Sequence, residues 1–426
     1  MVAIVIISLI FLLIFQMPIG LALLSSSLIA ALLKGIPPTL ILLKIVGGLN
    51  SFIFLAIPLF ILAGKIMNSG GITKRLFRFA NCLVGFIPGG LAHANVVASI
   101  IFAGMTGSAL ADVGGLGLIE MDSMKNAGYD TEFSACVTAA SSTIGPIIPP
   151  SIPLVIYGTI AEVSIGALFV AGFIPGLLMG LSLMIMIYFI SIKKGYPVGK
   201  RVSFKEILIL FKEAFLPMLT PVIIIGGILG GVVSPTEAAV LAVIYGLFLG
   251  IIVYREIKFR DLIFIFKDAM ILSAVIALIM AGATAFTWII TIENIPYKLV
   301  TLISNFSINK WIFLIIINLF YLLCGCIMEP IAILIMTAPL LIPLFKLYNL
   351  NPIHMGVVLV LNLMIGLITP PFGEALFIVS KIGGIRLEIL FKKILIFIIP
   401  LIIVLLLITF FPKIVMFLPT QFFKGI

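Results

Sequence analysis

Long apolar runs, separated by short charged connections, make up most of the chain. Many of these runs approach or exceed the roughly 20 apolar residues that a helix needs to cross a bilayer. The pattern therefore predicts an all-α polytopic membrane protein with on the order of ten spans. The predicted spans are residues 2–33, 40–63, 131–162, 166–192, 215–233, 236–254, 270–291, 352–380 and 394–418.

Two long regions are interrupted by glycine or proline and do not fit the pattern of single spans. They cover residues 88–124 and residues 311–345. Each region is long enough for two helices of half the membrane depth, which favours a re-entrant hairpin that enters and leaves by the same face. We expect the tips of the two hairpins to meet near the middle of the membrane.

The chain repeats its glycines, prolines and charged turns at a constant offset of 221 residues. This offset pairs Gly104 with Gly325, Lys125 with Lys346, Gly145 with Gly366 and Pro149 with Pro370. Each half then consists of a hairpin, a charged turn and a helix broken at the motif G-x-x-x-P-P. Chance matching between apolar segments is the alternative, because other identities are sparse. We predict two repeats, residues 1–192 and 234–426, joined by a cytoplasmic connection and a linking span at 193–233.

The composition agrees with a membrane protein and disfavours several other classes. Hydrophobic residues make up 63% of the chain and charged residues 10%, and the mean hydropathy is +1.38. The four cysteines lie in apolar segments and do not cluster with His93 or His354, which argues against disulfides and a zinc site. The sequence contains no phosphate-binding P-loop, so we do not expect the chain itself to hydrolyse ATP. We predict a transporter rather than an enzyme.

Positive charge indicates on which side of the membrane each connection lies. Four crossings in the first half and the linking span precede the second half, and this odd number of crossings predicts that the repeats are inverted. If the N-terminus is cytoplasmic, only seven of the 26 basic residues lie outside, namely Lys34, Lys44, Lys298, Lys310, Lys346, Lys413 and Lys424. We therefore expect a cytoplasmic N-terminus and a C-terminus on the opposite side. The net charge of +10 then reflects topology and not nucleic-acid binding.

The tip of the first hairpin carries small and polar residues instead of an apolar, lipid-facing surface. Thr106, Gly107 and Ser108 lie at the expected turn, and Asp112 follows one helical turn later. Glycines free backbone carbonyls and hydroxyls add oxygen ligands, which suit a hard cation such as Na⁺ or a polar substrate. Close helix packing through small residues is the alternative interpretation.

The first broken helix is predicted at Ser141–Ser151, where Gly145 precedes three prolines. Proline removes a donor and blocks continuation of the helix, so carbonyls lose their partners. Such backbone is tolerated in a membrane only where it is buried in protein or lines a cavity. Further oxygens could come from Ser141, Ser142, Thr143 and Ser151. A simple proline kink is the alternative.

The second half carries carboxylates at the corresponding elements. Glu329 lies at the second tip, at the position of Ser108 under the offset, and Glu374 follows the second break at Gly366–Pro371. A carboxylate inside the membrane is costly and marks a binding site by default. A structural hydrogen bond within the hairpin is the alternative for Glu329. For Glu374, a solvated or lysine-paired carboxylate is as good an interpretation as a functional one.

Several further segments give weaker predictions. The stretches Ile72–Phe86 and Ile295–Asn309 precede the hairpins and are interpreted as interfacial arms or as loops. The motif SPTEAA at Ser234–Ala239 predicts an outside turn and a helix start, with Ser234 as the cap and a structural role. For His93, packing or an interfacial hydrogen bond is favoured over proton transfer.

Four motifs in this order resemble the large membrane subunit of tripartite ATP-independent periplasmic (TRAP) transporters, the DctM-like family. They are GMTGSALAD from Gly104, SSTIGPIIPPS from Ser141, CIMEP from Cys326 and NLMIGLITPPFGEALF from Asn362. The resemblance covers essentially the whole chain. It implies inverted repeats, an elevator-type moving domain and the bacterial inner membrane. It also implies a small four-helix membrane subunit, a periplasmic substrate-binding protein and Na⁺ as coupling ion, with no other cofactor.

Carried onto this sequence, the resemblance implies where ions and substrate bind. Sodium would lie between the tip and the break of each half, with ligands among Thr106, Gly107, Ser108, Thr143, Gly145, Gly325, Met328, Gly366 and Thr369. An organic acid would lie between the two sodium sites, near Ser108, Ser151 and Glu329. Glu374 falls where the family commonly has an uncharged residue, which leaves sialic acid, C4-dicarboxylates and other organic acids open.

These features together predict sodium-coupled import of an organic acid that a binding protein delivers. A sodium/carboxylate symporter that needs no binding protein is the alternative within transport. A channel and an intramembrane enzyme are the alternatives from other classes, and the sequence offers no HExxH motif or clear Ser/His pairing for the enzyme.

Overall fold

The computed structural model of the chain describes residues 2–199, 202–295, 297–298, 300–301 and 308–423. Every regular element in these residues is a helix, and seven helices are long and apolar enough to cross a membrane. The seven are Phe52–Ser69, Ile165–Lys194, Phe204–Leu229, Pro235–Val253, Phe259–Ile292, Pro330–Leu347 and Leu387–Phe410. The prediction of an all-α, multi-pass membrane protein is confirmed.

The N-terminal region does not form the single span predicted over residues 2–33. Two packed helices replace it, α1 (Val2–Ile14) and α2 (Ile19–Leu33), and Pro18 lies directly before α2. Proline lacks the amide hydrogen that would continue the α1 ladder. At 1.5 Å per residue α1 is about 20 Å long, which is too short for a bilayer core of about 30 Å. The prediction of a single unbroken span is therefore wrong here.

The span predicted at 40–63 is also divided. It is replaced by α3 (Pro38–Leu49), a 3₁₀ turn at Phe52–Leu55 and α4 (Ala56–Ser69). At the other end of the chain, the span predicted at 394–418 becomes α19 (Leu387–Phe410) and a short α20 (Pro412–Phe422). Proline is the first residue of α3 and of α20. An amide at the first helical position makes no hydrogen bond within the helix, so proline loses nothing there, and its fixed φ suits the first turn.

Each of the two interrupted regions forms a pair of helices joined by a short turn. The first hairpin consists of α6 (Gly90–Thr106) and α7 (Ala109–Asn126). The second consists of α15 (Lys310–Gly325) and α16 (Pro330–Leu347). Gly107 makes the sharp turn of the first tip with a left-handed backbone, φ +59°, which glycine adopts without steric cost.

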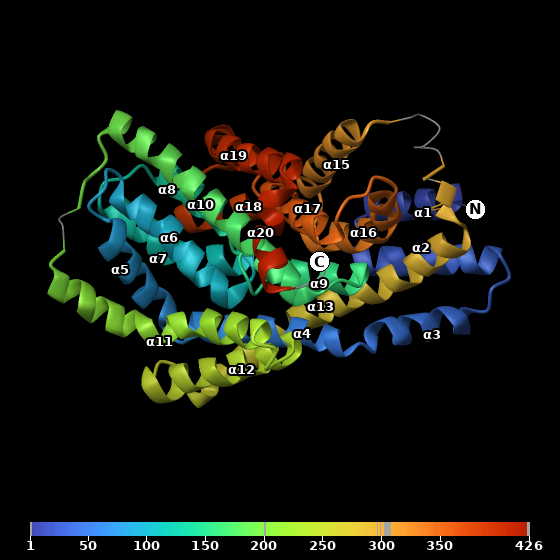
Figure 1. Cartoon of the computed structure of the whole chain (residues 1–426), viewed down its shortest axis with the longest axis horizontal. Helices are drawn as coiled ribbons and strands as arrows, with labels where there is room; N and C mark the ends of the chain where they lie inside the picture. Colours follow the sequence, from blue (N-terminus) through green and yellow to red (C-terminus); the bar gives the residue numbers. More distant parts are fainter. Residues whose placement is uncertain (1, 200–201, 296, 299, 302–307, 424–426) are drawn as a thin grey trace.

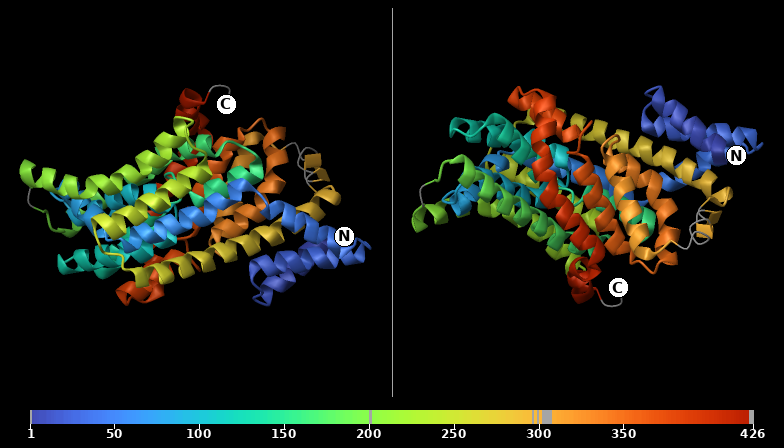
Figure 2. Two further views of the ribbon diagram at one scale, coloured as in Figure 1. Left: turned by 90° about the horizontal axis from the view of Figure 1, so that it is seen from below. Right: turned by 90° about the horizontal axis from the view of Figure 1, so that it is seen from above.

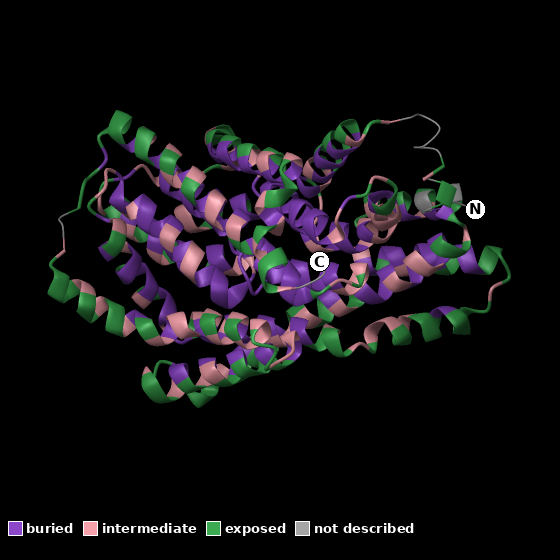
Figure 3. Ribbon diagram, in the orientation of Figure 1, coloured by how far each residue is buried: buried purple, intermediate pink, exposed green. Residues whose placement is uncertain are grey.

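A broken helix follows each hairpin. The first comprises α8 (Thr131–Ser142) and α9 (Ile152–Ala161), and the second α17 (Pro352–Gly366) and α18 (Glu374–Gly383). The Pro149–Pro150 and Pro370–Pro371 peptide bonds are both cis. All residues of α17 from Ile353 to Gly366 are buried, and Figure 3 shows buried residues concentrated around the broken helices. A helix that is apolar on every side belongs in the centre of a bundle.

The two halves interleave in a reciprocal way. α9 of the first half packs against α16 of the second, and α18 of the second half packs against α7 of the first. In the same way α8 packs against α19, and α17 packs against α10 (Ile165–Lys194). Each broken helix is thus held partly by the other half, and the hairpins and breaks lie together in the body of the molecule (Figure 1).

Long helices lie beside this central group. They are α11 (Phe204–Leu229), α12 (Pro235–Leu247, continued by a π-helical turn at Phe248–Val253) and α13 (Phe259–Ile292). α13 packs against α2, α3 and α4, and together with α11 and α12 these helices lie along one side of the molecule (Figures 1 and 2). The spans predicted at 215–233 and 270–291 each begin eleven residues too late.

Two of the weaker predictions can be compared with the structure. The first arm is the helix α5 (Ile72–Val84), which packs against α6 and α11, so the loop alternative is wrong. Ser234 caps α12 as predicted: its hydroxyl accepts from the Glu237 amide at 3.3 Å, and the Glu237 carboxylate accepts from the Ser234 amide at 2.7 Å. Most of the second arm, Ile295–Asn309, lies outside the described residues, as do Lys200, Arg201 and Lys424.

Candidate functional site

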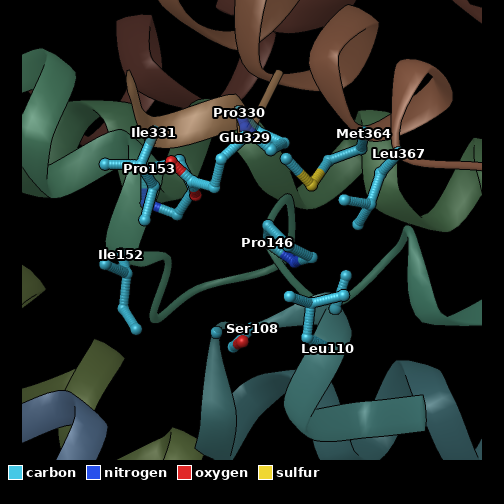
Figure 4. Close-up of a pocket in the computed structure, with 12 residues that line it drawn as sticks. Ser108, Leu110, Pro146, Ile152, Pro153, Glu329, Pro330, Ile331, Met364 and Leu367 are labelled. Carbon is cyan, nitrogen blue, oxygen red and sulfur yellow. The ribbon is translucent and has the colours of Figure 1, made fainter. Parts of the chain in front are cut away.

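A cavity of about 60 Å³ lies between the two hairpin tips. Its lining residues come from both tips and both breaks: Gly107, Ser108, Ala109, Leu110, Pro146, Ile152, Pro153, Glu329, Pro330, Ile331, Met364 and Leu367. Ser108 and Glu329 lie on opposite sides of it (Figure 4). The two tips therefore face one another across one cavity, as the sequence predicts.

Three helices begin at this cavity. The Ser108 hydroxyl caps α7 by accepting from the Ala111 amide at 3.4 Å, and the Glu329 carboxylate caps α16 by accepting from the Ala332 amide at 2.8 Å. α9 also begins here, with Ile152 and Pro153 in the wall. A helix N-terminus carries a partial positive charge of about half a unit. None of the twelve described residues in the wall is basic, so the helix N-termini supply its positive potential.

Ser151 differs from Ser108 and Glu329 because it does not line the cavity. Its side chain is fully buried, donates to the Pro146 carbonyl and accepts from the Leu154 amide at 3.2 Å. The serine thus fixes the shape of the first break and the start of α9. Direct contact between Ser151 and a substrate in the cavity is not supported by this arrangement.

The first tip lies directly against the first break. A Cβ atom added to Gly107 would lie 2.2 Å from the Pro150 carbonyl oxygen, and one added to Gly145 would lie 3.4 Å from Asp112 Oδ2. The Thr106 hydroxyl is 3.5 Å from Asp112 Oδ1. Thr106, Gly107, Ser108 and Gly145 therefore gather around the buried Asp112 carboxylate. Thr143 lies at the start of the break and donates to the Ala140 carbonyl at 2.6 Å, which leaves its oxygen lone pairs free to accept.

The second tip meets the second break through glycine backbone. A Cβ atom added to Gly366 would lie 2.6 Å from Gly325 Cα. The Thr369 hydroxyl donates to the Ile365 carbonyl at 2.7 Å. Met328 is partly buried against the core and, like Thr369, is not part of the cavity wall. The structure thus brings Gly325 and Gly366 together, with Met328 and Thr369 on the same tip and break.

Two sets of side-chain hydrogen bonds, which the sequence did not predict, each join a hairpin to its broken helix. Ser141 donates to the Asn95 side chain at 2.6 Å, and Asn95 donates to Thr138 at 2.8 Å. In the second half, Asn362 donates to the Asn318 side chain at 2.9 Å. Ser141 and Asn362 are equivalent under the offset of 221 residues. An isolated asparagine within an apolar run is the sequence feature that points to each set of hydrogen bonds.

Three further ionisable residues complete the surroundings. Glu120 on α7 is fully buried, and neither of its carboxylate oxygens has a hydrogen-bond partner among the described residues. Glu374 is half-buried in the first turn of α18 and forms no ion pair with a described residue, so the lysine-paired alternative is wrong. His93 is buried at the start of α6, in agreement with a packing role.

Solved structures with this architecture are membrane transporters. The chain resembles the YdaH transporter of Alcanivorax borkumensis with a TM-score of 0.63 and 13% identity, covering 87% of each chain. It resembles MtrF of Neisseria gonorrhoeae with a TM-score of 0.57 and 13% identity, covering 90% of this chain and 84% of MtrF. At this identity the likeness concerns the fold alone.

Sequence comparisons identify the family. Residues 6–414 match the family described as "Tripartite ATP-independent periplasmic transporter, DctM component", and the chain belongs to it. It is 47% identical over 379 residues to the sialic acid TRAP transporter large permease protein SiaM of Vibrio cholerae, covering 89% of each chain. It is 37% identical to the C4-dicarboxylate TRAP transporter large permease protein DctM of Pseudomonas aeruginosa, covering 88% of each. It is 43% identical to the sialic acid TRAP transporter permease protein SiaT of Haemophilus influenzae, covering 88% of this chain and 61% of SiaT.

Proposed function

We propose that this chain is the large permease of a sodium-coupled importer and that the cavity between the hairpin tips binds the organic acid. The observation that carries the proposal is the convergence of three helix N-termini on this cavity. Backbone amides at helix N-termini favour anions. Ser108 and Glu329 are then placed to contact the acid's polar groups from opposite sides.

Sodium is proposed because an anion alone does not satisfy the oxygen-rich tips and breaks. Around the first break, Asp112, Thr106 and Thr143 offer side-chain oxygens next to backbone that forms mainly i→i−3 turn hydrogen bonds in place of an α-helical ladder. Hard cations prefer such oxygen ligands. A sodium ion between tip and break would offset the Asp112 charge and hold the wall of the acid site in place. A second ion is proposed at the second tip and break, because they are equivalent to the first tip and break under the offset of 221 residues.

The substrate is proposed to be sialic acid, with C4-dicarboxylates as the second choice. Relatives at 47% and 43% identity are named for sialic acid, and a relative at 37% identity is named for C4-dicarboxylate. The apolar wall residues Leu110, Ile331 and Met364 suit an acid that presents carbon and hydrogen surface as well as a carboxylate.

The partners follow from the family, which is described as tripartite. We propose a small four-helix membrane subunit and a periplasmic substrate-binding protein as the other two parts, with membrane lipid around the assembly. We also place the chain in the bacterial inner membrane with its N-terminus cytoplasmic and its C-terminus periplasmic. The charge asymmetry of the connections supports this orientation.

Two inverted repeats and an elevator-type movement complete the proposal. The reciprocal packing of α9 with α16 and of α18 with α7 supports a two-fold relation between the halves. We propose that the hairpins and broken helices move together against the long helices α4, α11, α12 and α13. The acid and its sodium ions would travel within the moving group.

Uptake by proteoliposomes tests this function. The chain is reconstituted with its small subunit, and labelled sialic acid or succinate is supplied with or without the binding protein, with the proton gradient held at zero. We expect uptake only with an inward sodium gradient and the binding protein. Equal uptake without the binding protein would instead identify a self-sufficient symporter, and equal uptake without sodium would reject sodium coupling.

A further inference from the structure

A second cavity, of about 340 Å³, lies between the long helices and the central group. One wall is formed by Lys44 of α3 and by Met280, Ala283, Thr284, Thr287 and Trp288 of α13. The opposite wall is formed by Ile160 of α9 together with Ile335 and Pro339 of α16. The polar side chains of the cavity, Lys44, Thr284, Thr287 and Trp288, all lie on the first wall, and the second wall is apolar.

Lys44 is the cation of this cavity, and its charge is not neutralised within the described chain. Its ammonium lies 6.0 Å from the centre of the Trp288 ring, within the range of a cation–π contact. It forms no ion pair with a described carboxylate, whereas Lys34 is paired with Glu293. An unpaired cation beside an aromatic ring and a cavity attracts an anion.

Neighbouring groups can complete an anion site. The Thr284 hydroxyl already donates to the Met280 carbonyl at 2.8 Å. The Thr287 hydroxyl and the Trp288 indole N–H donate no hydrogen bond to a described residue, and both residues line the cavity. An ammonium, a hydroxyl and an indole N–H together match the oxygens of a carboxylate.

The second cavity and the cavity between the tips share two helices. On α16 the first cavity ends at Ile331 and the second begins at Ile335, one helical turn or roughly 6 Å away. On α9 the corresponding residues are Pro153 and Ile160, roughly 10 Å apart along the helix. The two cavities are therefore neighbours along α9 and α16.

We propose that Lys44, Thr287 and Trp288 form an anion-capturing antechamber that holds the carboxylate of a soluble organic acid before it enters the cavity between the tips. This inference rests on the proposed function, because it assigns the antechamber to the same transported acid. On the proposed orientation it opens toward the periplasm, the side from which the acid arrives. Lys44 guides the acid there, and Ser108 and Glu329 bind it afterwards.

Fluorescence of Trp288 tests the site independently of transport. The chain has two tryptophans, so Trp311→Phe leaves Trp288 as the only one. The full-length chain in lipid nanodiscs is titrated with iodide, an anionic quencher, and with acrylamide, a neutral one. We expect Lys44→Gln to lower the iodide quenching slope at least about threefold and to leave the acrylamide slope unchanged. Lys44→Arg should keep both slopes, as should the matched control Lys413→Gln, which removes an exposed lysine that is not part of the cavity.

The identity of the anion is decided by competition. Sialic acid or succinate should protect Trp288 from iodide in the parent protein but not in Lys44→Gln. If nanodiscs of anionic lipid depress iodide quenching and the soluble acids give no protection, Lys44 binds a lipid phosphate and the proposal is overturned. An iodide slope that is unchanged in Lys44→Gln overturns it as well, because the ammonium then attracts no anion to this cavity.

Uptake gives the functional test. At low acid concentration, Lys44→Gln should reduce uptake about tenfold, equivalent to ~1.4 kcal/mol, and high acid concentration should restore it. Normal uptake by Lys44→Gln alongside active parent protein would reject the antechamber and leave the proposed function intact. Absence of uptake by the parent protein would reject the proposed function, while the quenching slopes would still decide whether Lys44 attracts anions.

Discussion

Replacement of Glu329 by glutamine separates two roles of its carboxylate. The carboxylate caps α16 through the Ala332 amide at 2.8 Å, and it also faces the cavity opposite Ser108. Glutamine keeps the size and an oxygen acceptor but loses the charge. A hydrogen bond to a charged group contributes about 1.5–3 kcal/mol. Loss of such a contact to the acid's hydroxyl groups or to a sodium ion should therefore reduce kcat/KM for uptake by roughly 10- to 150-fold.

The cap should survive this substitution far better than it survives Glu329→Ala. Glutamine loses only the favourable interaction of a negative charge with the helix N-terminus, about 0.3–1 kcal/mol. Alanine also removes the acceptor, at a total of about 0.5–2 kcal/mol. Thermal unfolding of the purified variants should therefore rank the parent protein first, Glu329→Gln close behind and Glu329→Ala lowest. If Glu329→Gln supports uptake at the parental rate, Glu329 is only a helix cap and the site assignment fails.

Three further predictions test separate parts of the structure. Gly366→Ala places a Cβ 2.6 Å from Gly325 and should lower the free energy of unfolding by about 1–3 kcal/mol. The control Gly114→Ala places a Cβ that meets no atom within 4 Å and should not destabilise the protein. Equal Tm values for the two variants would contradict the close contact between the second tip and the second break. Thr143→Val or Thr369→Val should raise the sodium concentration for half-maximal uptake about fivefold, the equivalent of one neutral hydrogen bond of about 1 kcal/mol. The control Thr159→Val, which lies outside the break, should leave that concentration unchanged. If Thr143→Val and Thr369→Val keep the sodium dependence of the parent protein, neither hydroxyl is a sodium ligand. In the connection before α8, hydrogen bonds from the Lys194 ammonium and the Tyr196 hydroxyl lower the pKa of Asp130 in the folded protein. The ionised Asp130 carboxylate therefore stabilises the fold fully above its unfolded pKa of about 3.9, and this stabilisation is lost as pH falls through the lower folded pKa. The Tm difference between the parent protein and Asp130→Asn should accordingly shrink as pH falls below about 4, and a difference independent of pH would contradict the pairing.

The sequence predicted the two helix pairs and the broken helices well, because the glycines and prolines between their helices directly change the backbone conformation and its hydrogen bonds. Gly107 adopts a conformation that other residues resist, and the prolines after Gly145 and after Gly366 remove helix donors. The first 33 residues were harder, because the apolar character continues past Pro18 although the helix does not. A hydropathy pattern records where a chain is apolar but not where its hydrogen-bond ladder stops.

The candidate site was predicted in part for a related reason. Ser108 and Glu329 are small or charged residues at tips, and the offset already placed them at equivalent positions. Glu120 was not predicted as a buried residue, because it precedes the charged residues Asp122 and Lys125 and resembles part of an exposed turn. The fold nevertheless buries Glu120 completely. The antechamber could not be predicted either, because it depends on α3 packing against α13 and bringing Lys44 next to Trp288.

Sodium coupling is tested most directly by the affinity of the purified chain for sialic acid, or for succinate, in sodium and in potassium at equal ionic strength. A cation between tip and break completes the wall of the acid site, so sodium should raise the affinity for the acid. By linkage, saturating acid should raise the affinity for sodium by the same factor. Acid affinities that are equal in the two salts would contradict the account.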